Sequence, residues 1–262
     1  MFWRQLRLKI LPLCALLYCT VLVSCTTLAA TPVVDSSQNY QYHTIHSPDG
    51  IGKFYQGREI AKVMGHTEVL WLERPSRETE EQPQKVLDTL DLQSTDVVAD
   101  IGAGTGYFSF RMAQKLPNGK VLAVDIQPEM LDIIEFLKKD TGITNVETIL
   151  GNINNSNLSD NSIDLALMVD AYHEFSHPYE VMQAITKALK PGGRVVIVEY
   201  CKENPFIPIK GLHKMSQNQV KKEMAIVGLQ WQNTDESLPN QHIITFAKTV
   251  SQEPINKNKS SN

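Results

Sequence analysis

The stretch VADIGAGTGYF (Val98–Phe108) decides the fold, because it runs from an apolar segment through a glycine-rich turn into a helical segment. Asp96–Ile101 is short and apolar, as a buried strand is, and Gly106–Leu116 carries apolar side chains at helical spacing. Glycine lets a backbone approach a ligand closely, and ligands of doubly wound sheets lie beyond the carboxyl ends of the strands. We therefore predict a binding site at this turn.

Strand and helix segments alternate along the rest of the chain. Helices are predicted at Pro128–Lys139 and Tyr179–Leu189, and a further helix begins after Ser216, which fits a capping residue. Continuous β-branched runs are typical of strands that helices cover on both faces. The pattern predicts an α/β fold with a doubly wound, mostly parallel sheet, whose further strands are Lys120–Asp125, Val146–Leu150, Ile163–Val169, Arg194–Tyr200 and His242–Ala247.

The N-terminus has the pattern of a processing segment. Three basic residues precede the apolar run Ile10–Val23, and the four residues that end at Cys25 resemble a bacterial lipobox. We predict a signal peptide over residues 1–24, lipidation at Cys25, and an exported, membrane-tethered protein on the periplasmic side. The alternative is an uncleaved signal anchor, because no charge occurs from Ile10 to Val34.

Charge and cysteine content exclude two classes of protein. The 25 basic residues, less the three of the leader, leave 22 against 29 acidic residues, which is a net charge of −7 for the mature chain. Without a dense basic run, nucleic acid is an unsuitable partner. Of the four cysteines, only Cys201 lies in the body of the chain, which excludes an internal disulfide framework.

The remaining segments divide into four parts. Residues 25–41 are small and polar and are predicted to be a tether. Residues 42–91 are predicted to be a helical extension, with helices at Arg58–Met64 and Glu81–Leu90, which caps the site or packs as a plain layer on the sheet edge. Residues 92–248 form the ligand-binding domain, and residues 249–262 are predicted to be a disordered tail.

Two ligand classes fit a turn of this kind. A nicotinamide or flavin dinucleotide requires Gly-x-Gly-x-x-Gly, with its pyrophosphate at the helix N-terminus. Here Tyr107 stands at the position of the third glycine, and the Asp100 carboxylate would repel a pyrophosphate. The same carboxylate attracts an ammonium or a sulfonium, so a cationic ligand without phosphate is favoured.

Four segments carry a family resemblance. VADIGAGTGYF resembles motif I of the class I S-adenosylmethionine-dependent methyltransferases, and AVDIQPEML, SDNSIDLALMVDAYHEF and LKPGGRVVIVEY resemble later motifs in the same order. The resemblance implies a seven-stranded Rossmann-like fold and S-adenosylmethionine as cofactor. Within it, Asp125 corresponds to the acidic residue that binds the two ribose hydroxyls. The implied cofactor-binding residues are Asp100, Gly102, Ala103, Gly104, Gly106, Asp125, Ile126, Asn152 and Asp170.

One position departs from the family, and three flanking segments extend the resemblance. Asn152 stands where the family often has an aspartate that reaches the adenine amino group; an Asn carbonyl oxygen can accept that hydrogen bond too. GIGKFYQGREIAKVMGH, WLERPSRETEEQP and IPIKGLHKM resemble a bacterial subgroup of predicted exported methyltransferases, which implies no particular substrate.

The residues His173–His177 match His-Glu-x-x-His, the signature of zinc metalloproteases. That signature binds zinc only on a helix, where both histidines share one face. Pro178 disfavours helical angles at His177, and a strand precedes His173 closely. We therefore predict a loop here, and no metal.

The same segment falls where a methyl acceptor should meet the cofactor. His173 is the candidate general base, because its ordinary pKa lies near neutrality, and Glu174 is second; alternatively both only shape the loop. We predict an S-adenosylmethionine-dependent methyltransferase with a small-molecule acceptor. The alternatives are a non-catalytic cofactor-binding module, an NAD-dependent oxidoreductase and, more remotely, a zinc hydrolase. The predicted substrate-facing residues are Tyr55, Arg58, Trp71, Arg74, Tyr172, Lys210 and His213.

Overall fold

The computed structural model describes residues 39–248. The predicted signal peptide, the lipidation site Cys25 and the predicted disordered tail lie outside the described residues. The predicted tether overlaps them only at its end, where residues 40 and 41 already belong to strand β1, Tyr40–Tyr42. Within the described part of the chain, no helix has the length and apolar character needed to cross a bilayer.

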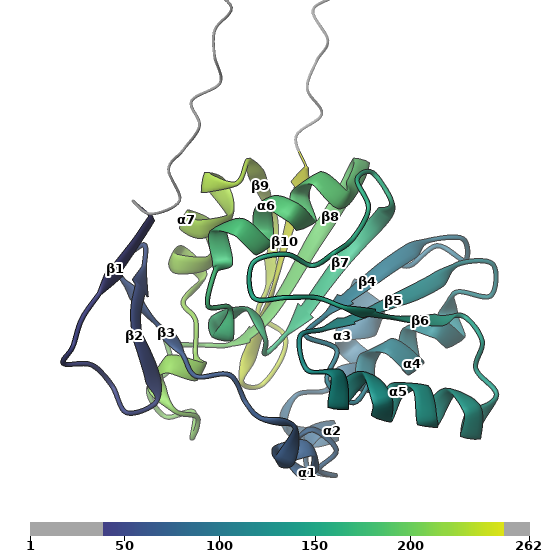
Figure 1. The fold of residues 1–262 in the computed structure, drawn as a ribbon, viewed down its shortest axis with the longest axis horizontal. Coiled ribbons are helices and arrows are strands. Elements are labelled where there is room, and N and C mark those ends of the chain that lie inside the picture. Colours follow the sequence, from purple (N-terminus) through teal and green to yellow (C-terminus); the bar gives the residue numbers. More distant parts are fainter. Residues whose placement is uncertain (1–38, 249–262) are drawn as a thin grey trace, which may run out of the picture. The chain divides into compact units, whose positions relative to one another are not determined.

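The central element is a seven-stranded sheet in the order β6-β5-β4-β7-β8-β10-β9 (Figure 1). The first five of these strands pair in parallel, whereas β10 pairs antiparallel with both β8 and β9. This confirms the doubly wound, mostly parallel sheet. The strands are β4 Val97–Ile101, β5 Lys120–Asp125, β6 Val146–Leu150, β7 Ile163–Val169, β8 Leu189–Tyr200, β9 Leu229–Asp235 and β10 Gln241–Lys248.

Helices cover both faces of the sheet (Figure 1). On one face, α6 and α7 pack their apolar side chains, such as Ile185 and Met224, against the strands. On the other face, α3, α4 and α5 do the same, with Leu87, Met112 and Ile134 among the buried residues. The helices are α3 Pro83–Thr89, α4 Tyr107–Lys115, α5 Pro128–Thr141, α6 Pro178–Ala188 and α7 Gln217–Ile226.

The strand order reverses at β4. From β4 the chain proceeds outward through β5 and β6, and it then returns to the other side of β4 to place β7 and β8. The glycine-rich turn follows β4 directly, so it lies at the switch point where doubly wound sheets bind their ligands. The edge strand β9 was not predicted from its residues, because only Leu229 at its start is fully buried and the strand lacks an apolar run.

The prediction of a helix at Arg58–Met64 is wrong. Residues 40–61 form a three-stranded antiparallel sheet of β1, β2 Gly50–Tyr55 and β3 Arg58–Ala61. Gln56 and Gly57 both have positive φ, of 52° and 94°, and Tyr55 pairs with Arg58. This is a two-residue hairpin turn, and the strand pairing that it imposes overrides the helical preference of the local sequence.

The rest of the extension is helical. The short helices α1 Val69–Leu72 and α2 Arg77–Glu80 precede α3, which begins with Pro83 in its first turn as predicted. A 3-10 turn at His66–Glu68 leads into α1. The extension is therefore half sheet and half helix, and its helical half leads into the seven-stranded domain.

Candidate functional site

The glycine turn has a backbone that only glycine tolerates well. Gly102, Gly104 and Gly106 have φ of 73°, 54° and 85°. A Cβ on Gly102 would lie 2.7 Å from the Cβ of Ala171, which is closer than such atoms approach. The amides of Gly102 and Ala103 both donate to the carbonyl of Val124 in β5, at 2.8 and 3.0 Å. The turn is thus fixed against the neighbouring strand, and α4 starts directly after Gly106.

Asp125 lies at the end of β5, against this turn. Its Oδ2 accepts from the amide of Gly104 at 2.9 Å, and its Oδ1 accepts from the amide of Gln127 at 2.9 Å. Burial raises the pKa of Asp125, although the backbone donors oppose the shift. A carboxylate held in this way keeps lone pairs for two neighbouring hydroxyl groups.

Asp100 and Asp170 are two further carboxyls at the strand ends. Asp100 is 3% exposed, its Oδ2 accepts from Ser109 Oγ at 2.6 Å, and burial raises its pKa to about 6. Asp170 has a positive φ of 49°, and burial together with Glu81 and Glu199 raises its pKa well above the ordinary value. The charge of Arg77 opposes the shift at both groups, but burial outweighs it.

A cavity opens along these residues. Its volume of about 670 Å³ is within the usual range for small-ligand sites. Two buried atoms of lining residues, Ser156 Oγ and Asp170 Oδ1, have no hydrogen-bond partner among the described residues. A buried polar atom is unfavourable without a partner, so these atoms fit a polar ligand. Of the predicted cofactor-binding residues, all except Gly106 line the cavity: Asp100, Gly102, Ala103, Gly104, Asp125, Ile126, Asn152 and Asp170.

Asn152 lines the cavity with part of its hydrogen-bonding capacity already used. Its Oδ1 accepts from the amide of Asn154 at 3.0 Å, within a local turn. An amide oxygen has two lone pairs, so one remains for an adenine amino group. Gly106, in contrast, allows close packing at the start of α4, because a Cβ there would lie 2.8 Å from the ring of Phe110.

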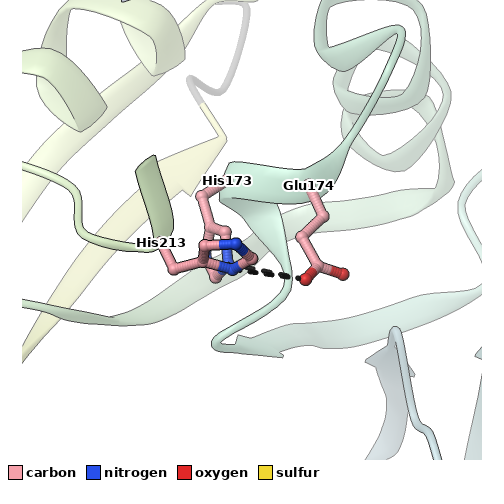
Figure 2. A group of neighbouring side chains, drawn as sticks. All are labelled: His173, Glu174 and His213. Carbon is pink, nitrogen blue, oxygen red and sulfur yellow. Dashed lines mark hydrogen bonds and ion pairs between the residues drawn. The ribbon is translucent and has the colours of Figure 1, made fainter. Parts of the chain in front are cut away.

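His173, Glu174 and His213 also line the cavity, and their side chains gather at one place (Figure 2). His173 and Glu174 lie in the 3-10 helix Tyr172–Glu174 after β7, and His213 ends the 3-10 helix Gly211–His213. His173 Nε2 lies 3.1 Å from His213 Nδ1 and 3.7 Å from Glu174 Oε1. On its other side, His173 Nδ1 lies 2.7 Å from Glu199 Oε2.

The protonation of this group is set by burial and by the carboxylates. Burial alone would lower the pKa of His173, but Glu199 and Glu174 outweigh it, and the pKa is raised. Burial raises the pKa of Glu174 to about 7. Burial and the neighbouring His173 lower the pKa of His213 to about 4, so His213 is a neutral imidazole at pH 7.

The helical half of the extension forms one wall of the cavity. Trp71 and Arg74 line it as predicted, with the Arg74 guanidinium 3.7 Å from the centre of the Trp71 ring. Arg77 and Glu81, which are not among the predicted substrate-facing residues, also line it and are paired at 2.6 Å. The exposed Lys210 lines the cavity with its partner Asp49, at 2.7 Å.

Three residues predicted to face substrate do not line the cavity. Tyr55, Arg58 and Tyr172 are buried beneath it, and two of them bind one carboxylate of α7. The Arg58 guanidinium donates to Glu223 at 2.7 and 3.1 Å, and the hydroxyl of Tyr172 donates to it at 2.6 Å. Arg58 also donates to the carbonyl of His173 at 3.2 Å, so it positions that residue and does not contact substrate.

The structure also shows where the two histidines of the protease-like pattern lie. His173 and His177 do not share a helix face: His177 precedes α6 as its capping residue, and its ring packs on Tyr40. Glu199, which binds His173, was missed. The sequence did contain a signal for Glu199, because a carboxylate inside the apolar run RVVIVEY has to find a buried partner.

Known proteins share the sequence pattern and the fold of this chain. Residues 92–247 match the family described as a methyltransferase domain. A crystal structure of a SAM-dependent methyltransferase from Aquifex aeolicus superposes with a TM-score of 0.67 at 24% identity, covering 71% of this chain and 100% of that one. That similarity supports the fold.

Curated relatives share the domain over part of their length. The chain is 30% identical over 146 residues to an uncharacterized methyltransferase-like protein of Schizosaccharomyces pombe, covering 56% of this chain and 54% of that one. It is 28% identical over 129 residues to a demethylmenaquinone methyltransferase of Chlamydia trachomatis, covering 49% and 55%. The chain thus spans about half the length of the curated relatives it matches.

The cavity fits the cofactor that the sequence motifs imply. Asp125 is placed for a pair of hydroxyls, the glycine turn permits close approach, and Asp100 and Asp170 supply negative charge for a cationic amino acid and a sulfonium. With the family match over most of the described domain, the chain belongs to the methyltransferase domain family.

Proposed function

We propose that this protein transfers a methyl group from S-adenosylmethionine to a small-molecule acceptor. The observation that carries the proposal is the continuity of one cavity, which runs from the glycine turn to the cluster of His173, Glu174 and His213. A donor at the turn and an acceptor at the cluster would share one cavity. Proximity, alignment and exclusion of water are the main sources of catalysis for such a displacement.

The cofactor, when bound, supplies an electrophilic methyl group on a sulfonium. Asp125 would hold the ribose hydroxyls, and Asp100 and Asp170 would face the cationic end. Trp71 and Arg74 would cover the site from the extension. The chain's part in this is to bind, orient and desolvate the two reactants.

A protic acceptor must lose a proton, and two groups are placed to take it. His173 is held by Glu199 at Nδ1, so its Nε2 faces the cluster. Glu174, with its pKa raised to about 7 by burial, is second. A buried imidazole oriented by a carboxylate is the usual arrangement of a general base.

The charge of the chain favours a small molecule over RNA. One relative, from Desulfotalea psychrophila, is named a tRNA U34 carboxymethyltransferase, whereas the Chlamydia relative is named a demethylmenaquinone methyltransferase. The present chain has 29 acidic against 25 basic residues, which does not suit a polyanion. The acceptor we propose is therefore a small molecule.

Calorimetry and a transfer assay test the proposal in sequence. S-adenosylhomocysteine should bind the full chain at one site, and Asp125→Ala should weaken binding, because it removes the carboxylate beside the turn. Asp132→Ala, on the exposed side of α5, is the matched control and should bind as the parent does. Absence of binding to the folded parent would contradict the proposal.

The transfer assay uses cofactor labelled at the methyl group. The label should appear in a low-mass metabolite fraction and not in tRNA. Label in tRNA would contradict the small-molecule acceptor. Binding without transfer to either pool would instead support a non-catalytic binding module.

We also propose that the protein is exported and tethered to the membrane through Cys25, as in the exported subgroup that the flanking segments resemble. The support is the order of basic residues, apolar run and lipobox-like residues at the N-terminus. S-adenosylmethionine is made in the cytosol, so this location requires the cofactor to reach the domain.

A further inference from the structure

We propose that His173, Glu174 and His213 form a binding site for a divalent transition-metal ion, with Zn²⁺ as the best match. The three side chains bring one donor atom each to within 4.8 Å of one another in the lining of the cavity. The proposal depends on the geometry of these side chains and is independent of the proposed methyl transfer.

The spacing of the three donor atoms matches an ion at their centre. His173 Nε2 and His213 Nδ1 are 3.1 Å apart, and Glu174 Oε1 lies 3.7 Å from the first and 3.6 Å from the second. A triangle with these edges has its corners about 2.0 Å from a common centre, which is the bond length that Zn²⁺ makes with imidazole nitrogen and carboxylate oxygen. Figure 2 shows the three side chains gathered at one place.

The donor set is one that binds metal in other proteins. Two imidazoles and one carboxylate ligate Zn²⁺ in catalytic sites, where a fourth position stays open for water or substrate. The same set also ligates Fe²⁺, and the general order of affinities favours Zn²⁺ over Fe²⁺. All three residues line the cavity, so the open position is accessible from it.

Neighbouring groups already orient each ligand. Glu199 lies 2.7 Å from His173 Nδ1, and a proton on that nitrogen leaves a lone pair on Nε2 for an ion. The amide of Met64 donates to Glu174 Oε2 at 3.1 Å, which leaves Oε1 for the ion. A carboxylate behind a ligating histidine is a common second layer of zinc sites.

Charge also suits a dication. The carboxylates of Glu174 and Glu199 both contact His173, at 3.7 and 2.7 Å, and neither has an Arg or Lys within ion-pair distance in the described chain. A divalent ion at the centre of the triangle would balance two carboxylates. Arg58 lies behind the site, but its charge is paired with Glu223.

The site is not the protease-like pattern of the sequence. That pattern would use His173 and His177, whereas here the second imidazole comes from His213, 40 positions along the chain. Its ring packs against that of His173 in an edge-on arrangement with centres 5.0 Å apart. The sequence prediction of no metal considered only the helical signature, and it could not place His213.

If the proposed methyl transfer also holds, the ion has a consequence for the acceptor. An acceptor that bears a hydroxyl or thiol would bind at the open position, and the ion would stabilise its anion. His173 Nε2 would then be a ligand and not a base. This consequence, unlike the site itself, rests on the proposed function.

Metal titration of the untagged full chain tests the site. The protein is stripped with a chelator, and Zn²⁺ is added against a chromophoric competitor, while circular dichroism confirms that each variant is folded. The parent should bind one equivalent. Glu174→Gln keeps the shape of the side chain, and His213→Ala changes a partly exposed residue, so both should fold and bind at least about tenfold more weakly.

His66→Ala is the matched control, because His66 is an exposed histidine with a carboxylate, Glu129, 3.9 Å away. Its affinity for Zn²⁺ should equal that of the parent. The proposal is overturned if the folded parent binds no stoichiometric Zn²⁺, or if Glu174→Gln and His213→Ala bind as tightly as the control. Binding of S-adenosylhomocysteine, measured on the same metal-free samples, reports separately on the proposed function.

Discussion

Replacing Asp100 with asparagine should make the protein more stable while weakening cofactor binding. Asp100 is 3% exposed and has one side-chain donor, Ser109, at 2.6 Å. Burial raises its pKa from 3.8 to about 6. At pH 7 the carboxylate is charged in both states, and the difference in pKa corresponds to about 3 kcal/mol of stability lost in the folded protein.

The sign of this effect fixes its pH dependence. Below about pH 4 Asp100 is protonated in the folded and unfolded states, so its burial contributes no charge penalty. As the pH rises through the folded pKa of about 6, the penalty reaches its full size. Asp100→Asn should therefore match the parent near pH 4 and exceed it at pH 7, by about 1–3 kcal/mol once repacking around the amide is allowed for.

Urea denaturation at a series of pH values measures the stability, and calorimetry with S-adenosylmethionine measures the affinity at pH 7. The loss of one charge facing a cation should weaken binding about tenfold, or ~1.4 kcal/mol. Asp132→Asn, an exposed control, should change neither quantity. A variant that is less stable than the parent at every pH, or that binds the cofactor equally well, would refute this account of Asp100.

Three further predictions concern the turn, the buried ion pair and the anchor. Gly102→Ala should lower stability by about 1–3 kcal/mol in thermal unfolding and weaken S-adenosylhomocysteine binding, because its Cβ would meet that of Ala171 at 2.7 Å and φ is 73°; unchanged binding would show that the turn adapts. Arg58→Met should lower the free energy of unfolding by about 3–5 kcal/mol in urea, because it leaves Glu223 buried without its partner, and the double variant with Glu223→Leu should recover part of that loss; no recovery would contradict the pairing. Cys25→Ala should abolish lipid attachment and membrane retention in fractionation, and retention equal to the parent would exclude the lipid anchor.

Local signals predicted most of the sheet and the cofactor turn. The strand before the turn, the glycines and Asp125 each depend on neighbours within a few residues or on one adjacent parallel strand. The hairpin at Gln56–Gly57 was missed, because the sequence around Arg58 favours a helix and only pairing with β2 decides otherwise. Strand β9 was missed for a similar reason, since an edge strand with one fully buried residue carries little pattern.

The acceptor end was predicted only in part. His173 and Glu174 were identified because they follow a strand at a motif position. Glu199 and His213 lie 26 and 40 positions further along, and their approach to His173 depends on the pairing of β7 with β8 and on the path of the segment after β8. Arg58 was assigned to the substrate side, whereas its partner Glu223, 165 positions away, holds it beneath the cavity.

The sequence by itself determined the fold class and the place of the glycine turn, because hydrophobic period, glycine conformation and strand ends are local properties. The predicted roles of Asp100 and Asp125 came from charge and from the family resemblance. Only the tertiary structure decided which charged groups meet. His173, Glu174 and His213 share a centre because two 3-10 segments after different strands converge on one edge of the sheet. Ion pairs, metal geometry and pKa depend on distances of a few ångströms between residues far apart in the chain, and those distances exist only once the strands are paired.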